Sequence, residues 1–593
     1  MKRTLGLLLA GLAVAASLTR PARAADNTWN NAAGDLVWDL TSANWTAPTV
    51  WTDGASAIFG ATGAGTINFA SSITAQGLAF HVPGYELAGN GYVLTLEGTS
   101  PTITANAPVT LGVSLGGTQG LTLNGTGTIS LTSDGAQGNT YTGGTHIEGG
   151  TVVLANANAV ANGSSYAIDS VESLAPGATL RLGSTFNGSA WVSAAPYQIA
   201  AAVVGTKLHL TGGTLDLYND PKSQRLPVLE GTGLVINTGP DVQAGVLMVA
   251  DGGDHEFSGV IADGNNGVLV GDNISPSQGP GYQIGIVQFA AQKNGGGGTL
   301  TLSGKNTYSG STRIDQGATI RLSGEGSIGF PTASNSFTGP LRVYGPGGLD
   351  LHGCNQTIAL MTSGNASGKI YNSATGTVST LTFGYGNEQA LNRNAGMQFI
   401  DNLGTGGVLA LKKVATGPPF LTPGTGAPAV NCVQTLSGVN TYSGDTTVAG
   451  GQLIMANVNA VSPNSAFRLF TVAQGLCPDT SVSLALNYEG TAPVRQLWID
   501  GVQQPNGVYG AGTPGIAPGS TGTLTVTGFA PVVLNASRSG NVLTLSWEGV
   551  YKLQTAANVV TGPWTDVPAG GTSPVQITVD ASKAEAYYRL ATY

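Results

Sequence analysis

The densest group of acidic residues is the stretch Asp-Gly-Gly-Asp-His-Glu, which places Asp251, Asp254 and Glu256 within six positions. Carboxylate and backbone oxygens are the ligands that Ca²⁺ takes in proteins, so this stretch is a candidate calcium site. Its spacing matches neither an EF-hand loop nor the nonapeptide repeat that binds Ca²⁺. A solvated turn ahead of the strand that begins at Phe257 explains the same residues, and we favour that interpretation.

The other residue types that could carry chemistry are dispersed along the chain. Five histidines occur without an HExxH or HxH pairing: His81, His146, His209, His255 and His352. A Gly-x-Ser-x-Gly sequence surrounds Ser114, but a nucleophile in that motif needs a strand before the turn and a helix after it. Here another strand pattern follows. We therefore find no catalytic motif and no cofactor site, and we predict that the chain is not an enzyme.

The first 24 residues predict export. Lys2 and Arg3 precede an apolar stretch, and Ala22-Arg23-Ala24 supplies the small-x-small pattern, so cleavage is expected after Ala24. The alternative, an uncleaved membrane anchor, is disfavoured because the apolar stretch is short for a bilayer span. No later apolar run approaches the ~20 residues that a transmembrane helix needs. The mature protein is thus predicted to be secreted or at the cell surface, with no transmembrane segment.

The composition indicates an ordered chain with few charges. Glycine accounts for 90 of 593 residues and charged residues for 9%, while 41% of the residues are hydrophobic. The net charge is −9 and no basic run occurs, which disfavours a nucleic-acid partner. Three cysteines, Cys354, Cys432 and Cys477, are too few for a disulfide framework. One pair could form a disulfide or all three could be small buried side chains, and their spacing predicts no zinc site.

Most of the chain alternates apolar with polar residues over short runs, as in Thr128–Leu131, Thr214–Leu217 and Thr523–Val526. This period of two places one face of a strand inward and the other face outward. Gly-Gly, Asn-Gly and Asp-Gly pairs between the runs predict tight turns. Strands this short cannot form a self-sufficient hairpin core, so they must stack on neighbours in an all-β fold.

One turn sequence, Asn-Thr-Tyr-Ser/Thr-Gly, occurs three times between such runs. Its asparagine, tyrosine and glycine are Asn139, Tyr141 and Gly143; Asn306, Tyr308 and Gly310; and Asn440, Tyr442 and Gly444. A unit that is repeated within one chain is typical of a stacked solenoid. The tyrosines are 167 and 134 positions apart, so they belong to distant coils. We favour local anchors that fold each turn against the wall over ligand-stacking rings.

The segment Gly298–Leu322 resembles the autotransporter-associated β-strand repeat, also called the passenger-associated transport repeat. The resemblance rests on the Gly-Thr-Leu-Thr-Leu-Ser-Gly run from Gly298, the turn at Asn306 and the Gly-Ala-Thr-Ile run from Gly317. It implies a right-handed parallel β-helix in an exported protein of a Gram-negative bacterium, with repeats at about 126–160, 298–330 and 433–465. The final unit, residues 530–593, is too short for the membrane barrel that ends an autotransporter, so self-translocation is not implied.

Two segments differ from the repeats. Residues 25–110 hold four of the eight tryptophans: Trp29, Trp38, Trp45 and Trp51. They could form a sugar-stacking surface, but a stacked core must be covered at its end, and we favour an apolar plug in an N-terminal cap. Residues 530–593 contain further strand patterns and are similar to fibronectin-type-III-like β modules. The β-helix is then expected over residues 111–529.

The favoured functional hypothesis is an exported structural or adhesin-like β-helix protein, with extracellular glycans or cell surfaces as partners. One alternative is a polysaccharide lyase or hydrolase, which would need acidic and basic side chains converging in one groove of the helix wall. The other alternative is a stalk that displays the C-terminal module as the binding part. The residues predict no particular oligomeric state.

Overall fold

The computed structural model describes most of the chain as short strands joined by turns. The described residues are 26–133, 138–155, 168–186, 191–193, 207–218, 224–226, 228–239, 245–250, 253–264, 284–289, 298–308, 312–315, 317–329, 341–363, 366–385, 393–401, 406–416, 433–474, 482–527, 534–547, 551–568, 573–580, 582 and 585–591. The predicted signal peptide, residues 1–24, lies outside them. Within these ranges, no helix has the length and apolar character needed to cross a membrane.

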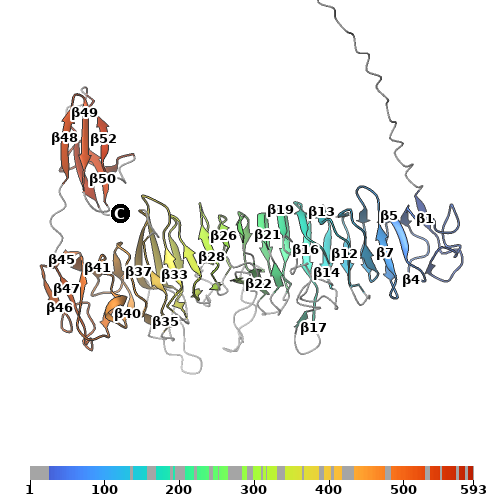
Figure 1. Ribbon diagram of the computed structural model, residues 1–593, viewed down its shortest axis with the longest axis horizontal. Helices are drawn as coiled ribbons and strands as arrows, with labels where there is room; N and C mark the ends of the chain where they lie inside the picture. The colour runs from blue at the N-terminus through green and yellow to red at the C-terminus, as the bar shows by residue number, and fades with distance from the viewer. Residues whose placement is uncertain are drawn as a thin grey trace, which may run out of the picture.

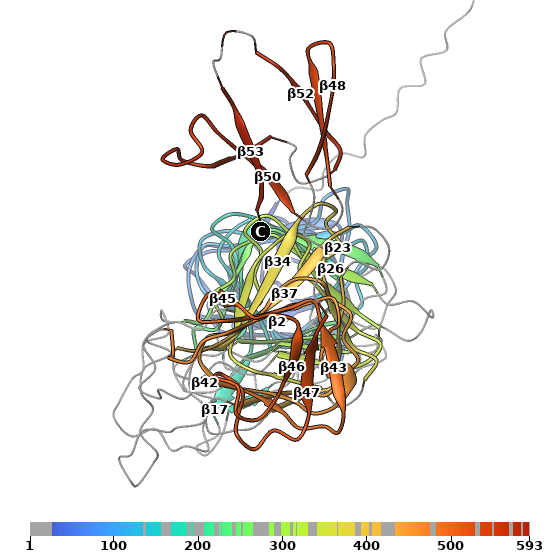
Figure 2. The ribbon, with the colours of Figure 1, turned by 90° about the vertical axis from the view of Figure 1, so that its left-hand side faces the viewer.

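The strands stack into a parallel β-helix, because most strands before residue 500 pair in parallel with a strand of the next coil. Figure 1 shows the coils stacked along the long axis from β1 (Asn27–Trp29) to β47 (Thr523–Val526), and Figure 2 looks along that stack. The longest series of parallel partners is β1 (Asn27–Trp29), β3 (Ala55–Phe59), β5 (Ile73–Phe80), β8 (Thr102–Ala105), β11 (Leu121–Asn124), β13 (Thr145–Ile147), β15 (Val171–Leu174), β19 (Leu208–Asp216), β21 (Leu229–Ile236), β23 (Asp254–Phe257), β26 (Thr299–Leu302), β28 (Thr319–Leu322), β30 (Gly348–Asp350), β33 (Lys369–Tyr371) and β36 (Gln398–Phe399).

A second series lies on another side of the coil. It contains β2 (Val37–Trp38), β4 (Thr66–Phe69), β6 (Tyr85–Ala88), β9 (Val109–Leu111), β12 (Thr128–Leu131), β14 (Thr151–Leu154) and β16 (Thr179–Leu182), then the ends of β19 and β21, and β24 (Val260–Ile261). The β6–β9–β12 pairing crosses residue 110 without a break. The parallel β-helix therefore begins in the first described strands.

Three further series form the walls of the middle and C-terminal coils. One contains β20 (Gln224–Leu226), β22 (Gly245–Ala250), β25 (Ile284–Phe289), β27 (Thr312–Asp315), β29 (Leu341–Val343) and β32 (Met361–Thr362). Another contains β31 (Gln356–Ile358), β34 (Val378–Tyr385), β37 (Val408–Thr416), β39 (Thr446–Val448), β41 (Ala466–Leu469) and β44 (Gln496–Ile499). The third contains β35 (Arg393–Ala395), β38 (Val433–Leu436), β40 (Gly451–Met455) and β42 (Val482–Leu486).

The separation in sequence between paired residues of successive coils gives the number of residues in one coil. Twenty residues separate Thr66 from its partner Glu86, and 23 separate Thr128 from Thr151. Along many of the strands, buried aliphatic residues alternate with residues that reach the surface, as in β26 and β28. The inward residues form one hydrophobic cluster that extends from Trp29 to Val526. The predicted all-β parallel β-helix is confirmed.

The N-terminal end is closed by the four neighbouring tryptophans. Trp29, Trp38, Trp45 and Trp51 are at most 2% exposed. Their rings meet mostly edge to face, with centroids 5.2 Å apart for Trp29 and Trp45 and 4.9 Å apart for Trp38 and Trp51. An antiparallel bridge also joins Trp29 to Trp45. Rings that are buried in this way cover the first coil and offer no face for a sugar to stack on.

Antiparallel strands end the solenoid, and a separate small unit follows. β45 (Val502–Gln503) pairs antiparallel with β44, and β46 (Gly507–Tyr509) pairs antiparallel with β47 (Thr523–Val526). The C-terminal unit has two three-stranded antiparallel sheets, β48 (Asn535–Ser539), β49 (Val542–Ser546), β52 (Val575–Thr578) and β51 (Thr565–Asp566), β50 (Lys552–Ala556), β53 (Tyr587–Ala591). Leu545, Trp547, Leu553 and Val575 form its core. This arrangement is sandwich-like; a closer relation to fibronectin type III stays a prediction.

Candidate functional site

The repeated turn begins with an asparagine that joins three successive coils. Asn306 is 1% exposed, and its Oδ1 accepts a hydrogen bond from the Ile261 N–H at 2.8 Å. Its Nδ2 donates to the carbonyl of Ser327 at 2.7 Å. Ile261 lies in the preceding coil and Ser327 in the following one. The carboxamide thus takes the place of a peptide group in the parallel ladder, where buried backbone groups need partners.

The other two repeats use their asparagines in the same way. Asn139 accepts from the Leu115 N–H at 2.8 Å, and Asn440 accepts from the Phe399 N–H at 3.0 Å. Asn440 also donates to the Ala460 carbonyl at 2.7 Å. In all three turns, the N–H of the next threonine donates to the carbonyl of the residue that the asparagine holds. The side chain and the following backbone therefore form one two-bond clamp on the preceding coil.

The repeat tyrosines are internal side chains. Tyr141, Tyr308 and Tyr442 are at most 2% exposed. Each hydroxyl is hydrogen-bonded to the hydroxyl of the threonine four positions later, at 2.8, 2.7 and 2.6 Å respectively. The rings pack inside the coil, so they cannot stack on a ligand outside it. Their hydroxyls instead fix the start of β13, β27 and β39.

The repeat glycines lie where two coils approach closely. A side chain at Gly143 would overlap the backbone of Gly120, and a side chain at Gly444 would overlap the Leu409 carbonyl. Gly143 also has a φ of 95°, which favours glycine. Gly310 lies outside the described residues.

The buried repeat tyrosines predict a loss of stability in alkali. Burial raises the pKa of Tyr308 and of Tyr442 above the usual value of 10.0. Above that pH the unfolded chain releases protons that the folded protein keeps, so the free energy of unfolding falls as the pH rises. Below about pH 10 both the folded and the unfolded chain keep the phenol protons, so the stabilisation from the two tyrosines is fully present. Denaturant unfolding at several pH values measures this slope.

A double variant provides the control for that prediction. Tyr308→Phe with Tyr442→Phe removes both phenols, so its unfolding free energy should fall less steeply above pH 10.0 than that of the parent protein. An equal slope in both proteins would show that these two groups do not cause the loss.

The acidic stretch is only partly described. Asp251 lies outside the described residues, whereas Asp254 and Glu256 lie on β23 with exposed side chains. Asp254 Oδ1 accepts from the Thr299 N–H at 3.0 Å, and Glu256 Oε1 accepts from Ser303 Oγ at 2.5 Å. Both carboxylates thus bind the next coil. Over the part of the chain that the structure describes, no group of three His, Cys, Asp or Glu side chains could hold a metal ion. Calcium binding stays a prediction.

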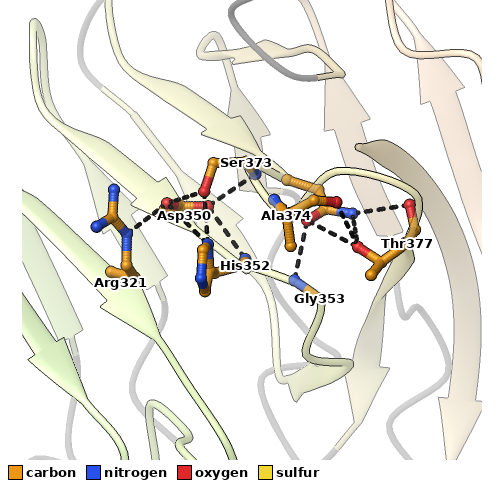
Figure 3. Close-up of polar contacts among 8 residues, drawn as sticks. Arg321, Asp350, His352, Gly353, Ser373, Ala374 and Thr377 are labelled. Carbon is orange, nitrogen blue, oxygen red and sulfur yellow. Dashed lines mark hydrogen bonds and ion pairs between the residues drawn. The ribbon is translucent and has the colours of Figure 1, made fainter. Parts of the chain in front are cut away.

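A buried carboxylate organises the polar cluster in Figure 3. Asp350 is fully buried, and its Oδ2 accepts from Arg321 Nε at 2.8 Å and from Ser373 Oγ at 2.6 Å. The backbone N–H groups of His352 and Ser373 donate to Oδ1, each at 3.0 Å. His352 Nδ1 lies 2.7 Å from Ser373 Oγ. Four donors therefore satisfy the carboxylate, and the guanidinium balances its charge.

The cluster contains the aspartate, histidine and serine of a serine-hydrolase triad, but their side chains are hydrogen-bonded in a different order. Ser373 lies between the acid and the imidazole. Because a carboxylate only accepts, the hydroxyl donates to Asp350, and His352 donates from Nδ1 to the serine oxygen. A serine nucleophile needs the reverse order, in which the imidazole takes the hydroxyl proton and the acid orients the imidazole. The geometry therefore does not activate Ser373.

A second cluster repeats the geometry with other residue types. Asp216 Oδ2 accepts from Arg181 Nε at 2.9 Å and from Thr238 Oγ1 at 2.6 Å. The N–H groups of Tyr218 and Thr238 donate to Oδ1 at 3.1 and 3.0 Å. Tyr218 has a φ of 43° and its counterpart His352 a φ of 42°. Thr238 and Tyr218 thus take the places of Ser373 and His352, while the backbone conformation and the hydrogen bonds to the aspartate are kept. This conservation of geometry without the residue types indicates a structural role.

Comparison with protein families identifies the repeated unit. The family described as the passenger-associated-transport-repeat matches residues 121–154, 295–322 and 433–455. The chain carries passenger-associated-transport repeats. Each matched range contains the strand before the asparagine turn and the strand after it. A passenger-associated-transport repeat in this chain therefore corresponds to about one coil. Its asparagine bonds the preceding coil, and its tyrosine hydroxyl bonds the threonine four positions later.

The repeat-bearing chain is also similar to a curated adhesin. It is 33% identical over 228 residues to the adhesin BmaC autotransporter of Brucella suis biovar 1 (strain 1330). The similarity covers 35% of this chain and 6% of that relative, so the chain spans a small fraction of the relative's length. No solved structure matches the chain.

Proposed function

We propose that this protein is an exported, adhesin-like rod whose outer wall binds extracellular glycans or cell surfaces. The observation that carries the proposal is the set of three passenger-associated-transport repeats within one β-helix core. The similarity to a protein named as an adhesin supports the same function. A rigid stack of coils presents the same wall over a long distance, which suits contact with an extended surface.

The polar clusters give little support to the alternative function, a polysaccharide lyase or hydrolase. Asp216 and Asp350 are each held by an arginine and three further donors, so neither carboxylate has the partial solvation of a general base. The exposed carboxylates of β23 bind the next coil. The polar groups described above therefore stabilise the stacking of coils rather than a reacting bond.

A polysaccharide panel tests the proposal. Purified protein without its signal peptide is passed over immobilised polysaccharides and over whole cells, and both retention and soluble oligosaccharides are measured. We expect retention without release of oligosaccharides. Release that is lost in Ser373→Ala would favour the hydrolase alternative. Failure to adhere to every polysaccharide and every cell surface would contradict the adhesive function.

A further inference from the structure

A basic and aromatic row crosses the outer face of the last coils. On adjacent strands of one sheet, its members are direct partners: Lys412 on β37, Thr447 on β39, Arg468 on β41, Trp498 on β44 and Gln503 on β45. On β37, β39 and β41 the residues that flank the row are buried, including Leu411, Val448, Phe467 and Leu469, and Leu497 before Trp498 is buried as well. Because side chains alternate along a strand, the Lys412–Gln503 row faces outward.

The middle of the row is held in place by neighbouring side chains. The Arg468 guanidinium lies 4.8 Å from the centroid of the Trp498 ring, and its Nε pairs with Asp445. Asp445 also pairs with Arg495 at 2.9 Å. The Trp498 indole N–H donates to Gln496 at 3.1 Å. A guanidinium that is stacked and paired before binding loses little further rotamer freedom when a ligand arrives.

The row is positively charged, whereas the protein is not. Lys412, Arg468 and Arg495 supply three cations against the carboxylates of Asp445 and Asp500, which leaves a local charge of about +1 within a chain of net charge −9. Lys412 is exposed at one end of the row. Strands lie ~4.8 Å apart, so Lys412 and Arg468, two strands apart, are separated by about 10 Å along the row. This is a linear site with cations at intervals.

We propose that the Lys412–Gln503 row binds an acidic polysaccharide laid across the coils. Carboxylate or sulfate groups of the polymer pair with Lys412 and with the arginine pair, and a sugar ring packs against the partly exposed indole of Trp498. The Thr447 hydroxyl and the Gln503 amide supply partners for sugar hydroxyls. Charge complementarity favours this ligand over a neutral glycan. The inference rests on the proposed adhesive function and assigns it a face and a ligand class.

The test uses the full mature chain with alginate as the acidic polymer and dextran as the neutral one. We expect retention on alginate that weakens as salt is added, and no retention on dextran. Lys412→Glu should weaken alginate binding about tenfold or more, because it reverses an exposed charge of the row. Trp498→Ala should weaken binding to a similar degree. Lys305→Glu is the matched control, since Lys305 is exposed outside the row.

The outcomes separate this inference from the general function. Alginate binding that is lost in Lys412→Glu and kept in Lys305→Glu supports the row. Equal alginate binding by both variants overturns it, as does adhesion to cells or neutral glycans without any binding to alginate. In that last case the adhesive function stands. A protein that adheres to nothing contradicts both. The Lys412→Glu result decides the question if Trp498→Ala fails to fold, because Lys412 is exposed.

Discussion

Replacing Trp38 by alanine is expected to open the N-terminal end of the β-helix. Trp38 is fully buried at the centre of the plug, with ring centroids 4.9 Å from Trp51, 5.0 Å from Trp45 and 5.0 Å from Phe69. Removal of a buried tryptophan costs about 3–5 kcal/mol through lost transfer free energy and the cavity that remains.

The loss should be local because each coil depends on its neighbours. In a solenoid, the stability of a terminal coil comes from one interface only, so the first coils unfold before the middle of the stack. Hydrogen exchange followed by peptide mass spectrometry should show faster exchange in β1 to β6 of Trp38→Ala and little change beyond β26. Leu40→Ala is the control, because Leu40 lies close in sequence and is 45% exposed. Unchanged exchange in β1 to β6 would contradict the plug.

Local patterns of the sequence predicted the fold class, and they did so for a physical reason. The alternation in Thr299–Leu302 and Thr319–Leu322 is the alternation of outward and inward side chains that the strands adopt. The asparagine–tyrosine turn is also local, because the Tyr308 hydroxyl reaches a threonine only four positions away. Four tryptophans within a short segment likewise meet in space. Each of these features is determined by neighbours along the chain.

Contacts between coils could not be predicted, because the coils vary in length. The asparagine clamps hold residues 24, 45 and 41 positions upstream in the three repeats. Loops of unequal length separate the partners, so no fixed spacing marks them. The Lys412–Gln503 row could not be predicted for the same reason, since its members come from five separate strands.

The two clusters around Asp216 and Asp350 share a sequence pattern from which they could have been predicted. Asp216-Leu217-Tyr218 and Asp350-Leu351-His352 share an Asp-Leu-aromatic pattern, and each is followed 22 or 23 positions after its aspartate by Thr238 or Ser373. A search for repeats outside the asparagine turns would have aligned them. It would also have paired Arg321, which has no charged equivalent in the three turns, with Arg181.

Replacing Asn440 by alanine should separate two coils of the third repeat. The change leaves the Phe399 N–H and the Ala460 carbonyl buried without their partners. An unsatisfied buried group costs about 1–3 kcal/mol, so the two together should lower the free energy of unfolding by about 2–6 kcal/mol. Urea unfolding measures the change. Asn106→Ala is the matched control because Asn106 is exposed, and an equal effect of both variants would contradict the clamp.

Asn440→Asp separates the loss of hydrogen bonds from the loss of volume. An aspartate has the shape of the asparagine and can still accept from the Phe399 N–H. When ionised, it cannot donate to the Ala460 carbonyl, and it places a negative charge in a buried site. When protonated, it can donate, so acid should restore part of the lost stability in this variant and none in Asn440→Ala. If both variants lose stability equally at every pH, protonation of the aspartate restores nothing, and the hydrogen bond to the Ala460 carbonyl does not hold the coil. If acid rescues only the aspartate, the hydrogen bond donated to the Ala460 carbonyl holds the coil, which is the bond that Asn440 Nδ2 makes in the parent protein.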